Sequence, residues 1–385
     1  MEKTSWLNQG SGRMFMRDML LQVSKAGYQA VRPLIFRQSA QSAHEKVLNL
    51  LTLTDQLPQP IIRLMGSIAF KNAPVTVGGV RLPHPFILAA GFVKGMGFET
   101  EQDALRAVRN GTNIMPGWRT MPNLVGTVEF GSFTRNPRMG NSGTVMWRDA
   151  DSRSTQNRVG LKNPGAVAAA AFLYQNRQHL PKTFGINIAP SPGVDDPADV
   201  IESMGAFLSR GVKPSWFTLN LSCPNTEDDP GSRQTETLTR ELCQAVTDYL
   251  KDIPLWVKIS PDLSDEQLNI LMSVFHEFSI QAVVSTNTLA QPTPDDDTLQ
   301  AGVGGGILYP HALRTVATLA KIKHEQNYPI DIIACGGVQD PMSYEAYARH
   351  GVEAFQYWSA LIYRGPLAAA LILNEIHKGD HESIT

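Results

Sequence analysis

The chain has 385 residues, and its 34 lysines and arginines nearly balance 36 aspartates and glutamates to leave a net charge of -2. This balance excludes the strongly basic surface of nucleic-acid-binding proteins, so we expect no nucleic-acid partner. The 3 cysteines are too few and too scattered for a disulfide framework or a metal site, and the hydrophobic fraction of 42% predicts an ordinary globular core.

The first 70 residues differ in pattern from the rest of the chain. Residues 1–12 are polar and rich in Gly and Ser, which predicts a flexible tail. Residues 13–70 carry a helical pattern, in which one apolar face is formed at i, i+4, i+7 and i+8 spacing by Ala43, Val47, Leu50 and Leu51. Basic residues are mixed with apolar ones ahead of this face, so the helical segment either associates with a membrane surface or packs on the main domain. We find no apolar run of about 18 residues, the length that a spanning helix needs.

Residues 71–385 predict a regular alternation of strands and helices. Two β-prone runs, Val75–Val77 and Val80–Leu82, flank Gly78-Gly79 and predict a tight hairpin. Eight further runs predict strands at Pro85–Gly91, Gly126–Gly131, Thr183–Ala189, Trp216–Ser222, Leu255–Ser260, Ala282–Asn287, Asp331–Gly337 and Ala354–Ser359. Because a helical pattern follows each strand, we predict an α/β fold, a closed (β/α)8 TIM barrel with an N-terminal helical extension. A doubly wound open sheet is the alternative, but no Gly-x-Gly-x-x-Gly turn follows the first strand.

Local signals mark the helix starts and the loops of this domain. Asp196-Pro197 and Asp340-Pro341 are N-cap and first-turn proline pairs, and Ser264 to Gln267 predicts a capping box. Two segments, 225–235 and 291–306, are long for this pattern, so we interpret them as loops of which at least one is a lid.

Polar residues cluster where the predicted strands end. Cys223 is flanked by Asn220 and Asn225, at a strand end where parallel α/β proteins place their chemistry. The alternative is that these asparagines only cap turns. Lys258 lies inside an apolar strand, so its ammonium needs an anionic partner or a ligand, unless it belongs to a buried structural ion pair. Gly336-Gly337, at another strand end, suits a phosphate cradle.

The set contains several carboxamides, two lysines and one thiol, without an acidic cluster. This composition is atypical of a metal hydrolase or a glycosidase. It favours a planar, polar, anionic substrate beside a phosphate-bearing cofactor.

From about residue 28 to residue 379 the chain resembles the dihydroorotate dehydrogenase family. The motifs that carry the resemblance are Ala89-Ala-Gly-Phe-Val-Lys94, Asn157-Arg-Val-Gly160, Gly185-Ile-Asn-Ile188, Asn220-Leu-Ser-Cys-Pro-Asn-Thr226, Val257-Lys-Ile-Ser-Pro-Asp262, Thr286-Asn-Thr288, Gly336-Gly337 and Ser359 to Pro366. The segment Tyr28–Phe36, followed by Ala43-His-Glu45, resembles the membrane-associated class 2 branch. That branch uses FMN and passes electrons to a quinone, so the resemblance implies both, with oxidation of dihydroorotate to orotate in pyrimidine biosynthesis.

The resemblance also implies residue roles. Cys223 matches the catalytic base, and His44 matches a histidine of the quinone pocket. Contacts to the substrate are implied for Lys94, Asn157, Asn220, Asn225, Asn287 and Thr288. Contacts to FMN are implied for Ala90, Gly91, Ser132, Asn187, Asn220, Lys258, Thr286, Gly336, Gly337, Trp358 and Ser359.

The chain also departs from the family pattern. The class 2 branch has serine as base, whereas Cys223 is typical of the soluble class 1 branch. The arginine that pairs with the quinone-pocket histidine is replaced, on our reading of the motif, by Val145. Further departures are an insertion over 100–124 and the residues Val93, Tyr309 and Trp358, where the family has Asp, Gly and Tyr.

These departures leave two alternatives beside dihydroorotate dehydrogenase. One is a related FMN oxidoreductase that acts on a different cyclic amide or enone, and the other is a barrel that binds FMN or a ligand without turnover. The expected location is peripheral, on the cytoplasmic side of a bacterial inner membrane. If the N-terminal helices only pack on the barrel, we expect a soluble cytoplasmic protein instead.

Overall fold

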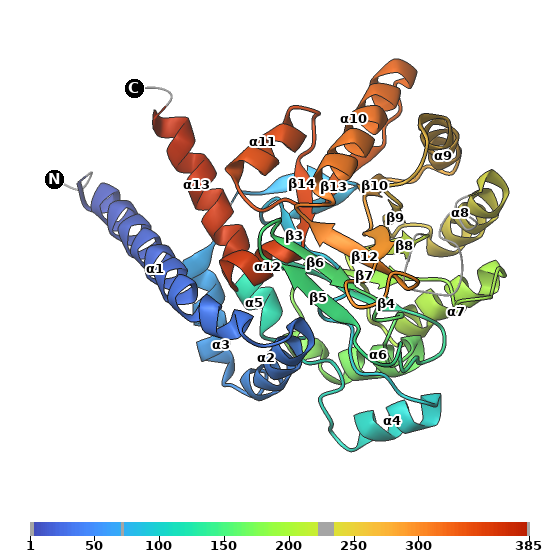
Figure 1. Cartoon of the computed structure of the whole chain (residues 1–385), viewed down its shortest axis with the longest axis horizontal. Helices are drawn as coiled ribbons and strands as arrows, with labels where there is room; N and C mark the ends of the chain where they lie inside the picture. The colour runs from blue at the N-terminus through green and yellow to red at the C-terminus, as the bar shows by residue number, and fades with distance from the viewer. Residues whose placement is uncertain (1–3, 71–72, 222–234, 383–385) are drawn as a thin grey trace.

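A closed barrel of parallel strands forms the centre of the molecule. The computed structural model describes residues 4–70, 73–221 and 235–382 (Figure 1). Neighbouring strands pair in the order β3 (Phe86–Leu88), β4 (Thr127–Phe133), β7 (Phe184–Ile188), β8 (Trp216–Asn220), β9 (Leu255–Ile259), β10 (Ala282–Ser285), β13 (Asp331–Cys335) and β14 (Ala354–Tyr357), and β14 pairs with β3. All eight predicted strands are present, so the (β/α)8 barrel is confirmed and the open sheet is wrong.

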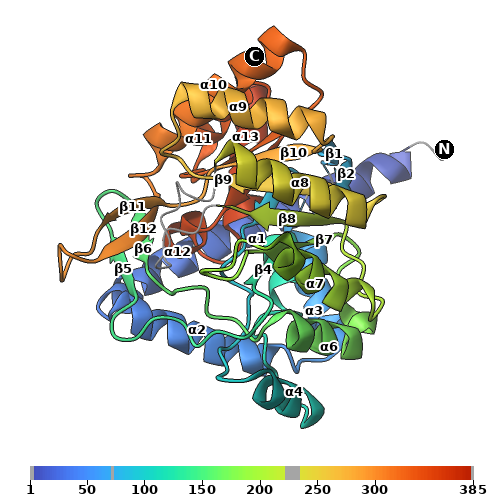
Figure 2. The ribbon, with the colours of Figure 1, turned by 90° about the vertical axis from the view of Figure 1, so that its right-hand side faces the viewer.

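Helices surround the barrel, as Figures 1 and 2 show. They are α4 (Glu101–Arg109), α5 (Met121–Val125), α6 (Ala166–Gln175), the short 3-10 helix η1 (Arg177–His179), α7 (Pro197–Leu208), α8 (Glu236–Leu250), α9 (Asp265–Glu277), α10 (Tyr309–Gln326), α11 (Pro341–Ala348), α12 (Ser359–Arg364) and α13 (Ala368–Glu382). The predicted caps are confirmed: Asp196 accepts from the Ala198 N–H, and Ser264 and Gln267 form a capping box. The insertion expected over 100–124 contains α4 and the start of α5.

A second, antiparallel sheet lies at the carboxyl ends of the barrel strands (Figure 2). It pairs β11 (Leu289–Pro292), β12 (Gln300–Gly305), β6 (Ser154–Asn157) and β5 (Met146–Asp149) in that order. The prediction of a long loop over 291–306 is therefore wrong, because its two ends form a hairpin. The glycines of β12 obscure the alternation of a strand, and its pairing partner β6 lies far away in the sequence. The other long segment, 225–235, lies outside the described residues apart from its last residue.

A hairpin closes the amino end of the barrel. Strands β1 (Val75–Val77) and β2 (Val80–Leu82) pair as predicted, and their apolar side chains pack with the lower interior of the barrel. There the rings of Trp216 and Trp256 stack with centroids 4.2 Å apart. Trp256 Nε1 donates to the Gly78 carbonyl at 2.9 Å, which ties the turn to the barrel. The interior is thus solid at this end, and any ligand must enter at the opposite end.

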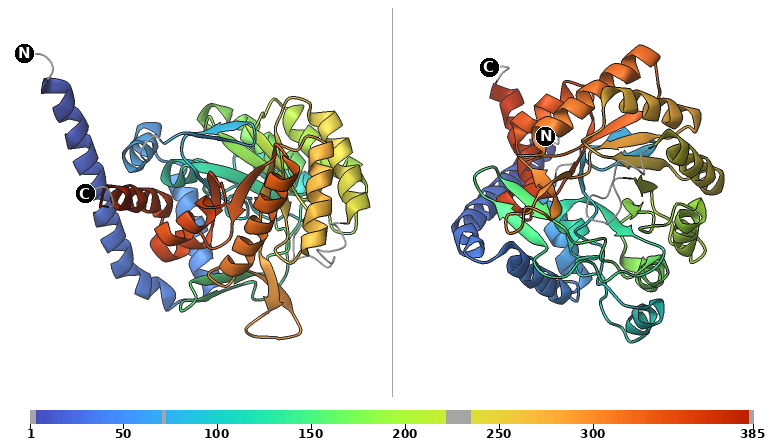
Figure 3. Two further views of the ribbon diagram at one scale, coloured as in Figure 1. Left: turned by 90° about the horizontal axis from the view of Figure 1, so that it is seen from above. Right: turned by 45° about the vertical axis from the view of Figure 1, so that its right-hand side comes forward.

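Three helices precede the barrel: α1 (Thr4–Phe36), α2 (Ala40–Thr54) and α3 (Gln59–Ala69). Figures 1 and 3 show α1 as a long rod beside α13. Leu21 is fully buried there against Leu367 and Leu371. The predicted flexible tail over 1–12 differs from the structure, in which helix begins at Thr4. Extending an existing helix requires no new nucleus, so polar and Gly-containing residues can join it at modest cost.

Asp55 fixes the end of α2 to the barrel domain. Its buried carboxylate accepts hydrogen bonds from the main-chain N–H groups of Gly117, Arg119 and Thr120, at 2.7, 3.3 and 2.9 Å. Asn113 Nδ2 donates to the same carboxylate at 2.9 Å. These hydrogen bonds therefore hold the end of α2 against the barrel domain.

Candidate active site

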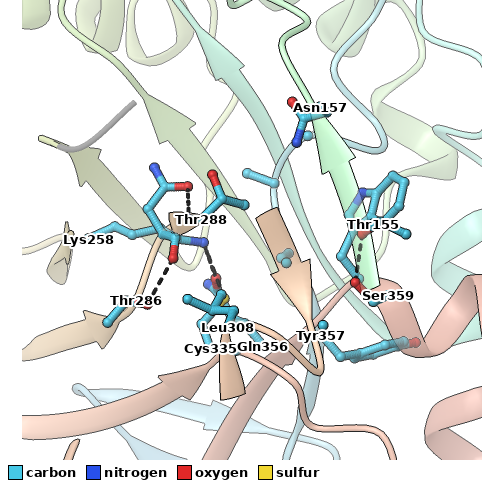
Figure 4. A pocket seen from close by; sticks show the side chains of 18 of the residues that line it. Thr155, Asn157, Lys258, Thr286, Thr288, Leu308, Cys335, Gln356, Tyr357 and Ser359 are labelled. Atoms are coloured by element: carbon cyan, nitrogen blue, oxygen red, sulfur yellow. Dashed lines mark hydrogen bonds between the residues drawn. The ribbon is translucent and has the colours of Figure 1, made fainter. Parts of the chain in front are cut away.

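One polar cavity opens at the carboxyl ends of the barrel strands, and Figure 4 shows part of its lining. We call it the polar cavity. Every site residue that we assigned to substrate or cofactor and that the structure describes lies in its wall: Ala90, Gly91, Lys94, Ser132, Asn157, Asn187, Asn220, Lys258, Thr286, Asn287, Thr288, Gly336, Gly337, Trp358 and Ser359. Cys223 and Asn225 lie outside the described residues.

A chain of hydrogen bonds orients the carboxamides of this cavity. Asn220 Nδ2 donates to Ser132 Oγ at 3.2 Å, and Asn287 Nδ2 donates to Asn220 Oδ1 at 3.2 Å. The Thr288 N–H in turn donates to Asn287 Oδ1 at 2.8 Å. These residues come from the ends of β4, β8 and β10, so three separate strands fix a row of amide groups. Such a row offers donors and acceptors in set directions to a planar polar ligand.

Lys258 is buried in the barrel wall, and its surroundings explain how the charge is accommodated. Its Nζ donates to Gln356 Oε1 at 3.0 Å and contacts Cys335 Sγ at 3.4 Å. Gln356 Nε2 donates to Glu129 Oε2 at 3.1 Å, so one amide bridges the ammonium and a carboxylate. Burial raises the pKa of the Cys335 thiol, although Lys258 opposes this shift. Cys335 is therefore a neutral wall group at pH 7.

Glu129 is the residue that the sequence reasoning missed. Its carboxylate is completely buried in the barrel interior, below the polar cavity. An acidic residue inside the apolar run Thr127–Phe133 was the available signal, the same signal that singled out Lys258.

The cavity wall fits a phosphate-bearing cofactor at two places. At Gly336 and Gly337 an added Cβ would lie 2.5 Å from the Cβ atoms of Ala312 and Tyr309, so only glycine allows this close approach to α10. The wall there consists of main chain, which suits a phosphate. Elsewhere in the wall, the buried Asn187 Oδ1 has no hydrogen-bond partner among the described residues. That acceptor suits a ring N–H of a bound group.

An apolar cavity of about 430 Å³ lies next to the polar cavity, between the N-terminal helices and the barrel. His44, Arg148 and Trp358 are in its wall. Four residues line both cavities and so form a thin partition: Met146, Thr155, Asn157 and Trp358. Phe92 links the two sides, since its ring meets His44 at 5.9 Å and Trp358 at 6.0 Å. Burial, and then the charges of Lys94 and Lys162, lower the pKa of His44 to about 4, so its imidazole is neutral at pH 7.

The interpretation that Val145 replaces an arginine in this pocket is wrong. Val145 precedes β5 and is absent from the described wall, whereas Arg148 lies in it. Arg148 Nη2 donates to the carbonyls of Ile35, Phe36 and Gln38 at the end of α1, and its guanidinium lies 4.3 Å from the Phe36 ring centroid. The register of β5 against β6, with Arg148 opposite Thr155, decides which residue reaches the cavity, and motif spacing does not reveal that register.

Comparison with known proteins places the chain in a family. Residues 72–379 match the sequence profile of dihydroorotate dehydrogenase, and the chain belongs to this family. It is 30% identical over 361 residues to the dihydroorotate dehydrogenase (quinone) of Mycobacterium bovis, with 91% of this chain and 92% of the relative covered. The enzyme of the same name from Rhodococcus opacus is 30% identical over 364 residues, covering 91% and 93%.

Solved structures agree with the fold. The DHODH of Eimeria tenella in complex with ferulenol superposes with a TM-score of 0.73 at 21% identity, covering 91% of this chain and 95% of that one. The ligand-free form of that protein gives a TM-score of 0.70 at 22% identity, covering 89% and 95%.

Replacing Arg148 by lysine should loosen the end of α1. A lysine cannot donate to three carbonyls and stack on Phe36 at the same time. We expect Arg148→Lys to speed tryptic cleavage after Arg37, measured by mass spectrometry. Arg177→Lys is the matched control, because Arg177 also stacks at 4.3 Å on a ring, that of Tyr174, but far from α1 in the chain. Equal cleavage rates in the two variants would contradict the role given to Arg148.

Proposed function

We propose that this protein is an FMN-dependent dihydroorotate dehydrogenase that oxidises dihydroorotate to orotate, a step of pyrimidine biosynthesis, and passes the electrons to a quinone. The observation that carries the proposal is the pair of adjoining cavities. One cavity is polar, and its wall contains the residues that we assign to substrate and cofactor and that the structure describes. The other cavity is apolar, and the partition between the two is formed by Met146, Thr155, Asn157 and Trp358.

The chain's own residues would bind and orient the substrate. Lys94 is the cation suited to the carboxylate of dihydroorotate, and it lines the polar cavity. The oriented amides of Asn220 and Asn287 suit the ring's imide and amide groups. Asn157 and Thr288 also line the polar cavity and would contact the substrate, and Asn225 would add a further carboxamide.

Cys223 would accept the proton from C5 of dihydroorotate. FMN, when bound, supplies the hydride acceptor for the hydrogen leaving C6 and the redox centre that passes electrons on to the quinone. A thiol has an ordinary pKa of about 8.5, so it is far easier to deprotonate than the serine of the class 2 branch. Lys258 and the main chain around Gly336 and Gly337 would hold the anionic parts of the cofactor.

The N-terminal helices are the proposed contact with the membrane. A stripe of exposed apolar residues, between 36% and 65% accessible, runs over them: Met16, Met19, Leu20, Val23, Val31, Leu34, Val47, Leu50, Leu53, Ile61 and Leu64. We call it the apolar stripe. On α1 its members follow i, i+3, i+4 and i+7 spacing, opposite residues that bond to the barrel domain, such as Tyr28 and Arg32.

The apolar stripe continues into the apolar cavity, because Val47 and Leu50 belong to both. A quinone could therefore pass from a bilayer to the partition beside the polar cavity without crossing water. Neutral His44 and the cation of Arg148 would be its polar contacts inside. Among the described residues, no helix combines the length and hydropathy needed to cross a bilayer. On the basis of the apolar stripe, we propose a peripheral protein on the cytoplasmic side of the inner membrane.

Turnover by purified protein tests the proposed function. Dihydroorotate should be oxidised with a soluble quinone as acceptor, and neither fumarate nor NAD should support a comparable rate. Orotate formation is followed by its absorbance. Turnover with fumarate or NAD alone would contradict the acceptor, and failure with dihydroorotate under all three acceptors would favour a related cyclic amide or enone as substrate.

Cys223→Ala should leave FMN bound but slow flavin reduction by dihydroorotate at least ~100-fold, the usual scale for losing a general base. Cys223→Ser should keep part of the activity, with a rate that rises towards high pH because a hydroxyl is harder to deprotonate. Stopped-flow absorbance of the flavin measures both. Reduction of Cys223→Ala at the parent rate would remove this residue from the mechanism.

Charges in the apolar stripe should weaken membrane binding. The double variant Val23→Glu, Leu53→Glu places carboxylates at two exposed positions. We expect it to lose co-sedimentation with vesicles of phosphatidylglycerol and phosphatidylethanolamine, while dihydroorotate still reduces its flavin at the parent rate. Met342→Glu, which changes an exposed residue on α11, is the control and should bind as the parent does. Parent-like sedimentation of the double variant would show that the stripe does not face the bilayer.

A further inference from the structure

Glu129 carries four hydrogen bonds in the barrel interior. Its Oε2 accepts from Trp216 Nε1 at 3.0 Å, from Thr218 Oγ1 at 2.6 Å and from Gln356 Nε2 at 3.1 Å. Its Oε1 accepts from Asn187 Nδ2 at 2.8 Å. A buried carboxylate is costly unless it is fully hydrogen-bonded, and this one meets donors from β7, β8 and β14. Two of the four donors, Asn187 and Gln356, also line the polar cavity.

The bond to Glu129 decides which end of the Asn187 amide faces the polar cavity. A carboxylate oxygen can only accept, so the Nδ2 group must point to Glu129. Oδ1, the other end of an amide that lines the polar cavity, is thereby left without a partner among the described residues. Were the amide turned over, the wall would present an N–H donor at the same place.

The same logic applies to Gln356. Its Nε2 is committed to Glu129, so Oε1 is the atom that remains for Lys258 Nζ, at 3.0 Å (Figure 4). The ammonium of Lys258 is thus held in the wall by a neutral amide whose own direction the carboxylate sets. The buried carboxylate of Glu129 therefore determines the direction of the Asn187 and Gln356 amides. Through Gln356 it also determines the position of the Lys258 ammonium.

We propose that Glu129 is a positioning residue that sets the hydrogen-bond polarity of the cofactor site, presenting an acceptor from Asn187 and the cation of Lys258 to the flavin. The inference rests on the proposed function, because it takes FMN as the ligand. Oxidised flavin has a single ring N–H, at N3, and carbonyl oxygens on either side of it. A protein hydrogen-bond acceptor flanked by donors or cations complements this edge of the flavin ring.

The test is Glu129→Gln, which keeps the size of the side chain. Oε2 has three donors, so we expect the new carboxamide oxygen to occupy its place and the new NH2 group to face Asn187. Asn187 should then turn its Oδ1 to that NH2 and its own NH2 to the polar cavity. FMN would lose one hydrogen bond, whereas N3-methyl-FMN, which lacks the donor, would not. We expect the preference for FMN over N3-methyl-FMN to fall about tenfold, measured by fluorescence titration of flavin-free protein.

Two variants separate this effect from general damage. Thr218→Val removes one donor from the same carboxylate but touches neither amide, so it should lower the melting temperature and leave the preference unchanged. Gln356→Met removes the amide that bonds to both Glu129 and Lys258 but leaves the bond between Asn187 and Glu129, so it should weaken the binding of both flavins and keep their ratio.

An unchanged ratio in folded Glu129→Gln protein would overturn the positioning role while leaving the proposed function intact. A loss of preference in Thr218→Val as large as in Glu129→Gln would also overturn it. Failure of the parent protein to bind FMN would instead overturn the proposed cofactor, and this inference with it.

Discussion

The burial of one carboxylate is the constraint on which the interior of this barrel depends. Below Glu129 the barrel is filled with apolar side chains and closed by the β1–β2 hairpin, and above it lies the polar cavity. A charge at that boundary must be matched by donors from the surrounding strands, and β7, β8 and β14 supply them. As a result, the amides of Asn187 and Gln356 in the wall of the polar cavity have fixed directions. The sequence predicts that Lys258 needs an anionic partner or a ligand, and Gln356 links its ammonium indirectly to the Glu129 carboxylate.

The polar cavity at the mouth of the closed barrel lies beside the apolar cavity. Parallel strands bring their carboxyl ends to one mouth, and strands β5, β6 and β12 of the antiparallel sheet line it from the side. The N-terminal helices enclose the apolar cavity because Asp55 and Arg148 bind them to the barrel domain. A polar substrate and a hydrophobic acceptor can therefore approach one cofactor from two sides.

The sequence predicts the repeating parts of this structure and misses what depends on pairing between distant segments. All eight strands follow from apolar runs bounded by turns, and the caps of α7 and α9 follow from local chemistry. The β11–β12 hairpin and the approach of Arg148 to the apolar cavity depend on antiparallel register, which no local pattern encodes. The sequence marks Glu129 only as an acidic residue inside an apolar strand, because its role depends on four partners from other strands. The role of Cys223 stays a prediction from sequence, since it lies outside the described residues.

On the proposed function, Lys258 and the wall of the polar cavity would hold one flavin within reach of a substrate in the polar cavity and of a quinone in the apolar cavity. Anaerobic mixing of purified protein, first with dihydroorotate and then with a short-chain quinone, tests it most directly. We expect the visible absorbance of the oxidised flavin to disappear on the first addition and to return on the second. A flavin that dihydroorotate does not bleach, or that the quinone does not restore, would contradict it.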